Sequence, residues 1–422
     1  MSREMKQSGI PWIGDIPISW EVMPHKRVMH KIKEIQEHYN GEDIISLTMR
    51  GVIVRDLDAG GKMPTSFDGY QKVYPNNLLQ CLFDIDVTPR CVGLIKNEGL
   101  TSPAYSQFEM HSNAYAPYYD YLLRYMDDGK TLLHLSKNLR SSLTETDFGA
   151  IDTCVPSIIE QQKIASFLDR KCAEIDEMIA LQEKIVEELK AYKQSVITEA
   201  VTKGLNPAVP MKDSGIEWIG QIPEHWEVCK IKNSLKINPP QCHKLEEDTE
   251  VSYMPMECLR NGVIEKRVAL YGSLPSLTEF SDGDIVMAKV TPCFENGNIA
   301  IASDLTNGVG FGSSEVFVFR CHDNTLSNYA FYYLQSPYVK ARGVSSMTGT
   351  GGLKRVNPHY FCDSVMLLPS YFEQQEIADY LDTKCTEIDN LISIKLSKID
   401  SLKEYKKSII YEYVTGKKEV TE

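Results

Sequence analysis

Two stretches of the chain, 156–204 and 369–422, carry apolar residues at alternating spacings of four and three positions. Neither stretch contains Gly or Pro between its opening proline and its end near Lys203 or Thr415. This spacing, with charged residues at most other positions, is typical of the seam of a coiled coil. The pattern therefore predicts two long helices. The expected seam consists of Leu168, Cys172, Ile175, Ile179, Gln182, Val186, Leu189, Lys193, Val196 and Ala200 in the first stretch and Leu381, Cys385, Ile388, Ile392, Lys395, Ile399, Leu402, Lys406, Ile409 and Tyr413 in the second.

Each of these helices needs a partner, because a large apolar side chain left in water forgoes about 1.5–3 kcal/mol of burial energy. The nearest partner is the other helix. Polar residues stand at the same two seam positions in both stretches, Gln182 with Lys395 and Lys193 with Lys406. Such polar layers reduce stability and fix the register of a coiled coil. The alternative is two unrelated surface helices packed on their own domains, which does not explain why the seams match position for position.

The two helical stretches belong to an internal repeat. Residues 6–22, KQSGIPWIGDIPISWEV, recur at 212–228 as KDSGIEWIGQIPEHWEV, and all four tryptophans of the chain lie in these segments. The helical stretches match at an offset of 213 residues, whereas the sequences before them differ. The chain is thus two copies of one unit. We expect globular blocks at 1–155 and 205–368 and helical segments at 156–204 and 369–422.

The order of these parts predicts how the helices are oriented. The second tryptophan-rich segment begins soon after the first helical stretch ends. If the two copies are equivalent, the first tryptophan-rich segment lies beside the end of the second helix. A pseudo-twofold axis then relates the copies and makes the helices antiparallel. The predicted fold class is α+β, with two similar α/β domains separated by two long helices that form an antiparallel intramolecular coiled coil.

Composition narrows the class of protein. A chain of 422 residues is too long for one ordinary hydrophobic core, and 42% apolar residues indicate globular domains. The net charge of -13 argues against a simple basic nucleic-acid binder, so any DNA contact must depend on local clusters. Eleven scattered cysteines without a CxxC pair suggest reduced thiols, and no apolar run is long enough for a membrane span. We expect a soluble, cytoplasmic protein with no membrane partner.

Several motifs together point to a known family. They are the SGIxWIGxIPxxWEV segments, the Pro-x-x-x-Glu-Gln-Gln junctions that begin at Pro156 and Pro369, and the helical stretches that follow. In the second block, GDIVMAKVTPCFENGNIAI (283–301) and GFGSSEVFVFR (310–320) look like strand segments, and GLTSPAY (99–105) stands in the first block where GFGSSEV stands in the second. Over nearly its whole length the chain resembles the specificity subunit of type I restriction-modification enzymes.

This resemblance implies a non-catalytic role in DNA recognition. Each block would be a target recognition domain that reads one half of a bipartite, asymmetric site on double-stranded DNA. The helices would set the spacer between the halves and dock two methyltransferase subunits. Those subunits would bring S-adenosylmethionine, and restriction subunits would bring ATP hydrolysis with Mg and DNA cleavage, so the chain itself would hold no cofactor. A coiled-coil structural adaptor and a fused DNA methyltransferase remain as alternatives.

Motifs for catalysis or metal binding are incomplete. Asp128-Gly129-Lys130-Thr131 lacks the first glycine of a phosphate-binding loop. The string Asn238-Pro239-Pro240 is similar to the base-holding motif of DNA aminomethyltransferases, but Gln241 follows where that motif has an aromatic residue. Cys242-His243 and Cys321-His322 are adjacent pairs without the spacing of a zinc site. We therefore predict no catalytic and no metal-binding residues.

Candidate DNA contacts are basic side chains in polar surroundings, because Arg and Lys bind phosphates and guanine edges. The most DNA-like segment, 340–355, contains four basic residues and no acidic one, and 129–143 is its counterpart in the first block. Segments 47–55 and 257–267 each read as an Arg-bearing turn followed by a strand. A plain surface charge is the alternative for every candidate. The candidates are Arg50, Arg55, Lys130, Lys137, Arg140, Arg260, Lys266, Arg267, Lys289, Lys340, Arg342, Lys354 and Arg355.

Overall fold

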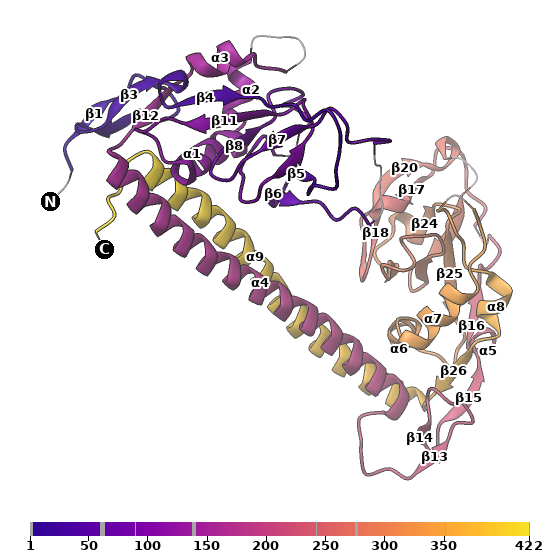
Figure 1. The fold of residues 1–422 in the computed structure, drawn as a ribbon. Helices are drawn as coiled ribbons and strands as arrows, with labels where there is room; N and C mark the ends of the chain where they lie inside the picture. The colour runs from indigo at the N-terminus through magenta and orange to yellow at the C-terminus, as the bar shows by residue number, and fades with distance from the viewer. Residues whose placement is uncertain are drawn as a thin grey trace. The chain divides into compact units, whose positions relative to one another are not determined.

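The computed structural model describes residues 3–59, 64–88, 90–136, 141–241, 243–274, 277–350 and 352–421 (Figure 1). The chain forms two compact units, Met1–Glu183 with Ser397–Glu422, and Lys184–Leu396. Each long helix, α4 (Ile158–Lys203) or α9 (Tyr371–Val414), contributes to both units. The predicted helical segments 156–204 and 369–422 are therefore each shared between the units. The predicted fold class is confirmed.

The first unit is built around an antiparallel sheet of order β4-β11-β8-β9, with helix α1 packed against β9. Two-stranded sheets β1-β2, β3-β12, β5-β6 and β7-β10 surround it. The elements are β1 (Met5–Gln7), β2 (Asp15–Pro17), β3 (Glu21–Pro24), η1 (His25–Arg27), β4 (Met29–Ile32), β5 (Ile45–Thr48), β6 (Gly51–Val54), β7 (Gln71–Val73), β8 (Leu78–Gln80), β9 (Val92–Leu94), β10 (Gly99–Thr101), β11 (Ser106–Met110), α1 (Ala116–Asp128), α2 (Thr131–Leu135), α3 (Glu145–Ala150) and β12 (Asp152–Val155).

The second unit repeats this plan. Its sheet β16-β25-β22-β23 corresponds to β4-β11-β8-β9, β15-β26 to β3-β12, and β13-β14 to β1-β2. A second four-stranded sheet, β20-β17-β24-β21, contains a parallel β17-β24 pair. The elements are β13 (Met211–Asp213), β14 (Gln221–Pro223), β15 (Glu227–Lys230), α5 (Ile231–Ser234), β16 (Leu235–Ile237), β17 (Glu250–Met254), η2 (Met256–Cys258), β18 (Leu259–Arg260), β19 (Val263–Ile264), β20 (Arg267–Leu270), η3 (Tyr271–Ser273), β21 (Thr278–Ser281), β22 (Ile285–Ala288), β23 (Ile299–Ile301), η4 (Thr306–Gly308), β24 (Val309–Gly312), β25 (Val316–Cys321), α6 (Ser327–Leu334), α7 (Pro337–Ser345), α8 (Pro358–Cys362) and β26 (Val365–Leu368).

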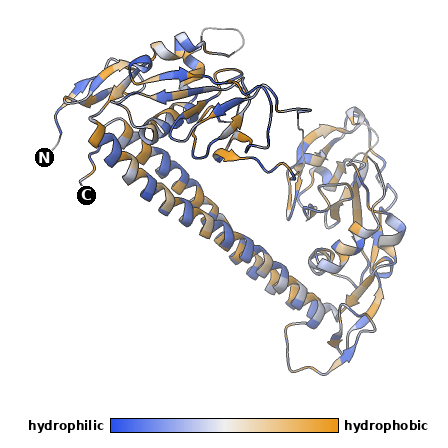
Figure 2. Cartoon of the chain, viewed as in Figure 1, coloured by the Kyte–Doolittle hydropathy of each residue, from blue (hydrophilic) through white to orange (hydrophobic). Residues whose placement is uncertain are grey.

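Helices α4 and α9 pack against each other in both units, and apolar and polar residues alternate along both helices (Figure 2). All twenty positions of the expected seam are buried or half-buried. Two ion pairs cross the seam at equivalent places. Lys406 lies 2.6 Å from Asp176 in the first unit, and Lys193 lies 2.7 Å from Asp389 in the second. Residue numbers rise along one helix as those of their partners fall along the other, so the helices are antiparallel.

The crossed ion pairs allow a direct test of helix register. Replacing Asp389 by Lys sets two positive charges side by side, and adding Lys193→Asp restores an opposite-charge pair. Because the carboxylates are more than half exposed, we expect a coupling energy of only about 0.2–1 kcal/mol. A double-mutant cycle in urea at low and high salt measures it. Coupling that is absent at low salt, or that does not weaken with salt, would contradict an electrostatic role.

The tryptophan-rich segments lie beside the helix ends, as the repeat predicted. In the first unit Trp20 is fully buried in the core that contains Val414 at the end of α9. The backbone of Gly416 comes so close that a Cβ atom there would lie 2.5 Å from Cδ of Pro17. In the second unit Trp226 shares a core with Val201 near the end of α4. Each copy thus begins where the helix of the other copy ends.

A buried glutamine joins each long helix to its globular domain. Gln161 donates to the carbonyl oxygens of Asn113 and Pro156 (both 2.9 Å) and accepts from the Tyr115 backbone N–H (2.8 Å). Gln374 makes the same set of bonds with Asn324, Pro369 and Leu326. Tyr115 and Leu326 are the residues that precede α1 and α6. The Glu-Gln-Gln junction therefore caps one helix with the side chain of another.

Removing this cap should destabilise the domain that it anchors. For Gln374→Leu we expect a loss of about 1–3 kcal/mol in the free energy of unfolding, because three buried backbone groups lose their partner. Chemical denaturation of the full chain measures this loss. The adjacent Gln375 provides a matched control, since its exposed side chain bonds only the Asp379 carboxylate (2.8 Å) and Gln375→Leu removes no buried bond. Equal losses in the two variants would refute the anchoring role.

None of the helices in the described ranges is long and apolar enough to cross a membrane. Ten cysteines lie in those ranges and all are free, while Cys242 lies outside them. Among the described residues no group of three or more His, Cys, Asp or Glu side chains could hold a metal ion.

Candidate nucleic-acid interface

Three loops of the second unit meet in what we call the loop edge, residues 289–298, 313–315 and 346–356. They connect β22 to β23, connect β24 to β25, and follow α7. Thr291 Oγ1 donates to the Gly352 carbonyl oxygen (2.8 Å) and accepts from the Lys354 backbone N–H (2.9 Å). The Lys289 N–H donates to the carbonyl oxygen of Glu315 (3.0 Å). Polar residues that are far apart in sequence are thereby fixed on one surface.

An ion pair stands at the centre of the loop edge. Arg355 donates from Nε and Nη2 to the two carboxylate oxygens of Glu315, at 2.8 Å each. The Arg355 side chain is 48% exposed and that of Glu315 is 26% exposed. Arg355 lowers the pKa of Glu315 below its ordinary value, mainly through these hydrogen bonds. The carboxylate is therefore charged at neutral pH and holds the guanidinium in a fixed plane.

Other basic candidates of segment 340–355 differ in their surroundings. Lys340 and Lys354 are exposed. Arg342 is half-buried on helix α7, where Nε donates to Ser364 Oγ (3.0 Å) and the guanidinium lies over the Tyr338 ring. The segment is thus not a single loop, because residues up to Ser345 are helical. Lys289 is half-buried, with Nζ 5.9 Å from the Phe317 ring centroid.

The hairpin β18-β19 and the strand after it carry three further candidates. Arg260 bonds the carbonyl oxygen of Leu259 (3.1 Å). Lys266 donates to the carbonyl oxygens of Ser303 (2.6 Å) and Asp304 (3.1 Å). Arg267 lies 3.7 Å from the Glu257 carboxylate and is 60% exposed. All three are exposed residues with short-range contacts to their own domain.

The first unit presents fewer described candidates. Arg50 is exposed in the turn between β5 and β6, and Arg55 is half-buried just after β6. Lys130 precedes α2 with a left-handed backbone, and its Nζ lies 3.4 Å from the Thr88 carbonyl oxygen. Lys137 and Arg140 lie outside the described residues. The structure therefore brings basic residues together at the loop edge of the second unit but does not place their full counterpart in the first.

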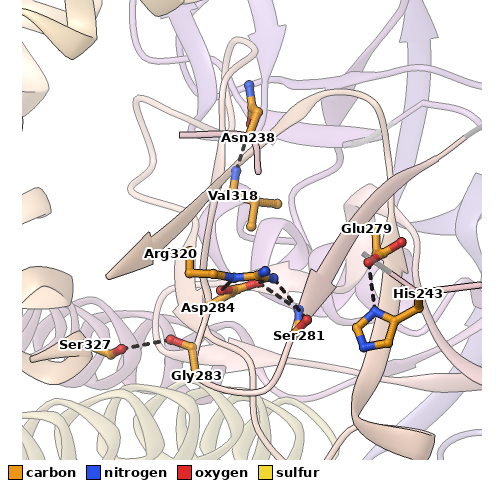
Figure 3. A network of polar contacts seen from close by, with 9 residues as sticks. All are labelled: Asn238, His243, Glu279, Ser281, Gly283, Asp284, Val318, Arg320 and Ser327. Carbon is orange, nitrogen blue, oxygen red and sulfur yellow. Dashed lines mark hydrogen bonds and ion pairs between the residues drawn. The ribbon is translucent and has the colours of Figure 1, made fainter. Parts of the chain in front are cut away.

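A polar network holds the strands behind the loop edge (Figure 3). Asp284, which is buried, binds Arg320 at 2.6 and 2.8 Å and accepts from the Ser281 backbone N–H. Asn238 accepts from the Val318 N–H (3.0 Å), so this residue ties β25 to the end of β16. His243 lies 2.8 Å from the Glu279 carboxylate. The motifs around residues 284 and 320 therefore stabilise the sheet rather than face a ligand.

Two residues of the interface escaped prediction from the sequence. Glu315 was not a candidate because acidic side chains repel phosphates, and nothing in the sequence placed it beside Arg355. The buried role of Gln161 and Gln374 was also missed. The repetition of Glu-Gln-Gln at both helix starts was the signal that could have revealed it.

Comparisons with known proteins agree with the resemblance found in the motifs. No family model matches the chain. The chain is 29% identical to the type I restriction enzyme EcoEI specificity subunit of Escherichia coli over 223 residues, which cover 52% of this chain and 37% of that protein. It is 27% identical to the type I restriction enzyme MjaVIII specificity subunit of Methanocaldococcus jannaschii, over 64% of this chain and 63% of that one.

Solved structures show the same fold. A chain of a type I R-M system, solved in work on complex assembly and conformational transition, matches with a TM-score of 0.70, 12% identity, and coverage of 94% of this chain and 98% of that chain. The HsdS subunit from Thermoanaerobacter tengcongensis matches with a TM-score of 0.52, 15% identity, and coverage of 95% and 98%. The similarity to specificity subunits is thereby confirmed, although this chain spans only 37% of the length of the two Escherichia coli relatives that it matches.

Proposed function

We propose that this chain, a homologue of the type I restriction enzyme specificity subunits, is the DNA-specificity subunit of a type I restriction-modification system. Each globular domain reads one half of a bipartite, asymmetric site on double-stranded DNA. The observation that carries this proposal is the repeated plan of the fold. Two domains share one sheet order and one glutamine anchor, yet carry different residues in their loops. A protein that reads two different half-sites needs this combination.

The antiparallel helices give the proposed protein its second role. They set the spacer between the half-sites and dock two methyltransferase subunits, which supply S-adenosylmethionine, while restriction subunits supply ATP hydrolysis with Mg and DNA cleavage. The chain itself is non-catalytic and works in the cytoplasm. Its net charge of -13 supports the need for partners, since phosphate neutralisation drives much of DNA affinity.

Reconstitution with the methyltransferase subunit encoded beside this chain tests the proposal. We expect a stable complex that protects two base clusters separated by an unprotected spacer, and that methylates the same sequence. A structural adaptor would give a complex without sequence preference. A fused methyltransferase would modify DNA with S-adenosylmethionine and no partner. One continuous footprint, or either of these two results, would reject the proposal.

A further inference from the structure

The ion pair of Arg355 with Glu315 leaves one edge of the guanidinium available. Nε and one hydrogen of Nη2 are directed to the carboxylate. The opposite edge consists of Nη1 and the second hydrogen of Nη2, and Nη1 has no hydrogen-bond partner among the described residues. Two parallel N–H groups are the donors that match O6 and N7 of guanine in the major groove. The geometry therefore keeps the side chain in place without using the edge that reads a base.

The backbone on both sides of the pair is also fixed. Arg355 exchanges two backbone hydrogen bonds with Thr348, at 2.9 and 3.0 Å. The Glu315 N–H donates to Ser313 Oγ (3.1 Å), which closes a short turn. A guanidinium held by a carboxylate and anchored at its backbone loses little further entropy on binding.

The first unit retains the turn but not the carboxylate. The Ala104 N–H donates to Ser102 Oγ (3.3 Å), as the Glu315 N–H does to Ser313 Oγ. Ala104 therefore occupies the place of Glu315 in an equivalent turn. The scaffold is common to both domains, and the side chain that holds an arginine is present in one domain only. This difference is what two domains with different target bases would show.

We propose that Arg355 reads a guanine in the half-site of the second domain, and that Glu315 is the positioning residue that holds it. This inference rests on the proposed function. The carboxylate fixes the plane of the guanidinium, and its negative charge disfavours a phosphate in the same place. Arg355 is thus assigned to base readout rather than to the DNA backbone.

Sequencing of methylated DNA tests this assignment in a host that carries the chain with its methyltransferase partner. Arg355→Lys keeps the positive charge but loses the paired donors. We expect it to reduce discrimination at one guanine of one half-site by about 5- to 150-fold, and to leave the other half-site unchanged. Glu315→Gln should weaken discrimination at the same base by a smaller factor. Arg267→Lys is the matched control, since its exposed side chain is only loosely paired with Glu257.

The outcomes separate this inference from the proposed function. Unchanged discrimination in Arg355→Lys, or an equal loss at both half-sites, would overturn the assignment of Arg355. A change in Arg355→Lys that Glu315→Gln does not share would overturn the role of Glu315. Thermal unfolding of the purified chains shows whether each variant folds like the parent, and Glu315→Ala serves as a second variant if Glu315→Gln does not fold. Failure of the proposed function is distinct, because the unaltered chain would then direct no bipartite methylation.

Discussion

A chain that lacks one heptad in each long helix is expected to direct methylation of the same half-sites with a shorter spacer. The deletions are Gln182–Glu188 in α4 and the equivalent Lys395–Ser401 in α9. Each removes seven residues, so the seam positions before and after the cut keep their register. The helix pair shortens by about 10 Å at 1.5 Å per residue. At about 3.4 Å per base pair, the spacer should lose about three base pairs.

Sequencing of methylated DNA in a host with the partner subunits measures this change. As a control of unchanged length, Glu187→Gln and Glu188→Gln alter exposed residues of the deleted segment and should leave the spacer as it was. Altered bases in either half-site would show that the helices influence readout directly. An unchanged spacer would refute the role of the helices in setting it.

The helices and the repeat could be predicted because their determinants are local and periodic. Seam residues such as Leu168 and Leu381 recur at spacings that only a helix brings onto one face. The antiparallel orientation followed from the order of the repeated segments. The two crossed ion pairs were not predicted, because Asp176 and Asp389 lie outside the seam positions that the pattern identifies.

The loop edge could be predicted only in part, because it depends on contacts between distant segments. Lys354 and Arg355 stood out by composition, yet their neighbours Thr291 and Glu315 come from two other loops. Arg342 lies in the same basic segment, but a helix directs it toward Ser364. Charge and residue type identify a segment, whereas tertiary packing decides which of its side chains face outward.

The stability of the first unit is expected to fall as the pH decreases from 6.5 toward 4, because of His25. This side chain is fully buried, its Nδ1 lies 3.2 Å from the Phe148 carbonyl oxygen, and its Nε2 has no hydrogen-bond partner among the described residues. Burial lowers the pKa of His25 from 6.5 to about 4, and the bond to Phe148 opposes the shift only in part. The unfolded chain therefore binds a proton at pH 5 that the folded chain does not.

The sign and size of this effect follow from linkage. Above pH 6.5 neither state is protonated and the stabilisation is complete, whereas between 6.5 and about 4 it decreases by about 3 kcal/mol in total. Urea unfolding across this range measures the decrease, but surface carboxylates titrate there as well. His25→Ile isolates the histidine, because Ile231 fills the equivalent buried position at the start of α5 in the second unit. The variant should lose about 3 kcal/mol less than the parent over the same range, and parallel pH profiles would show that His25 is not responsible.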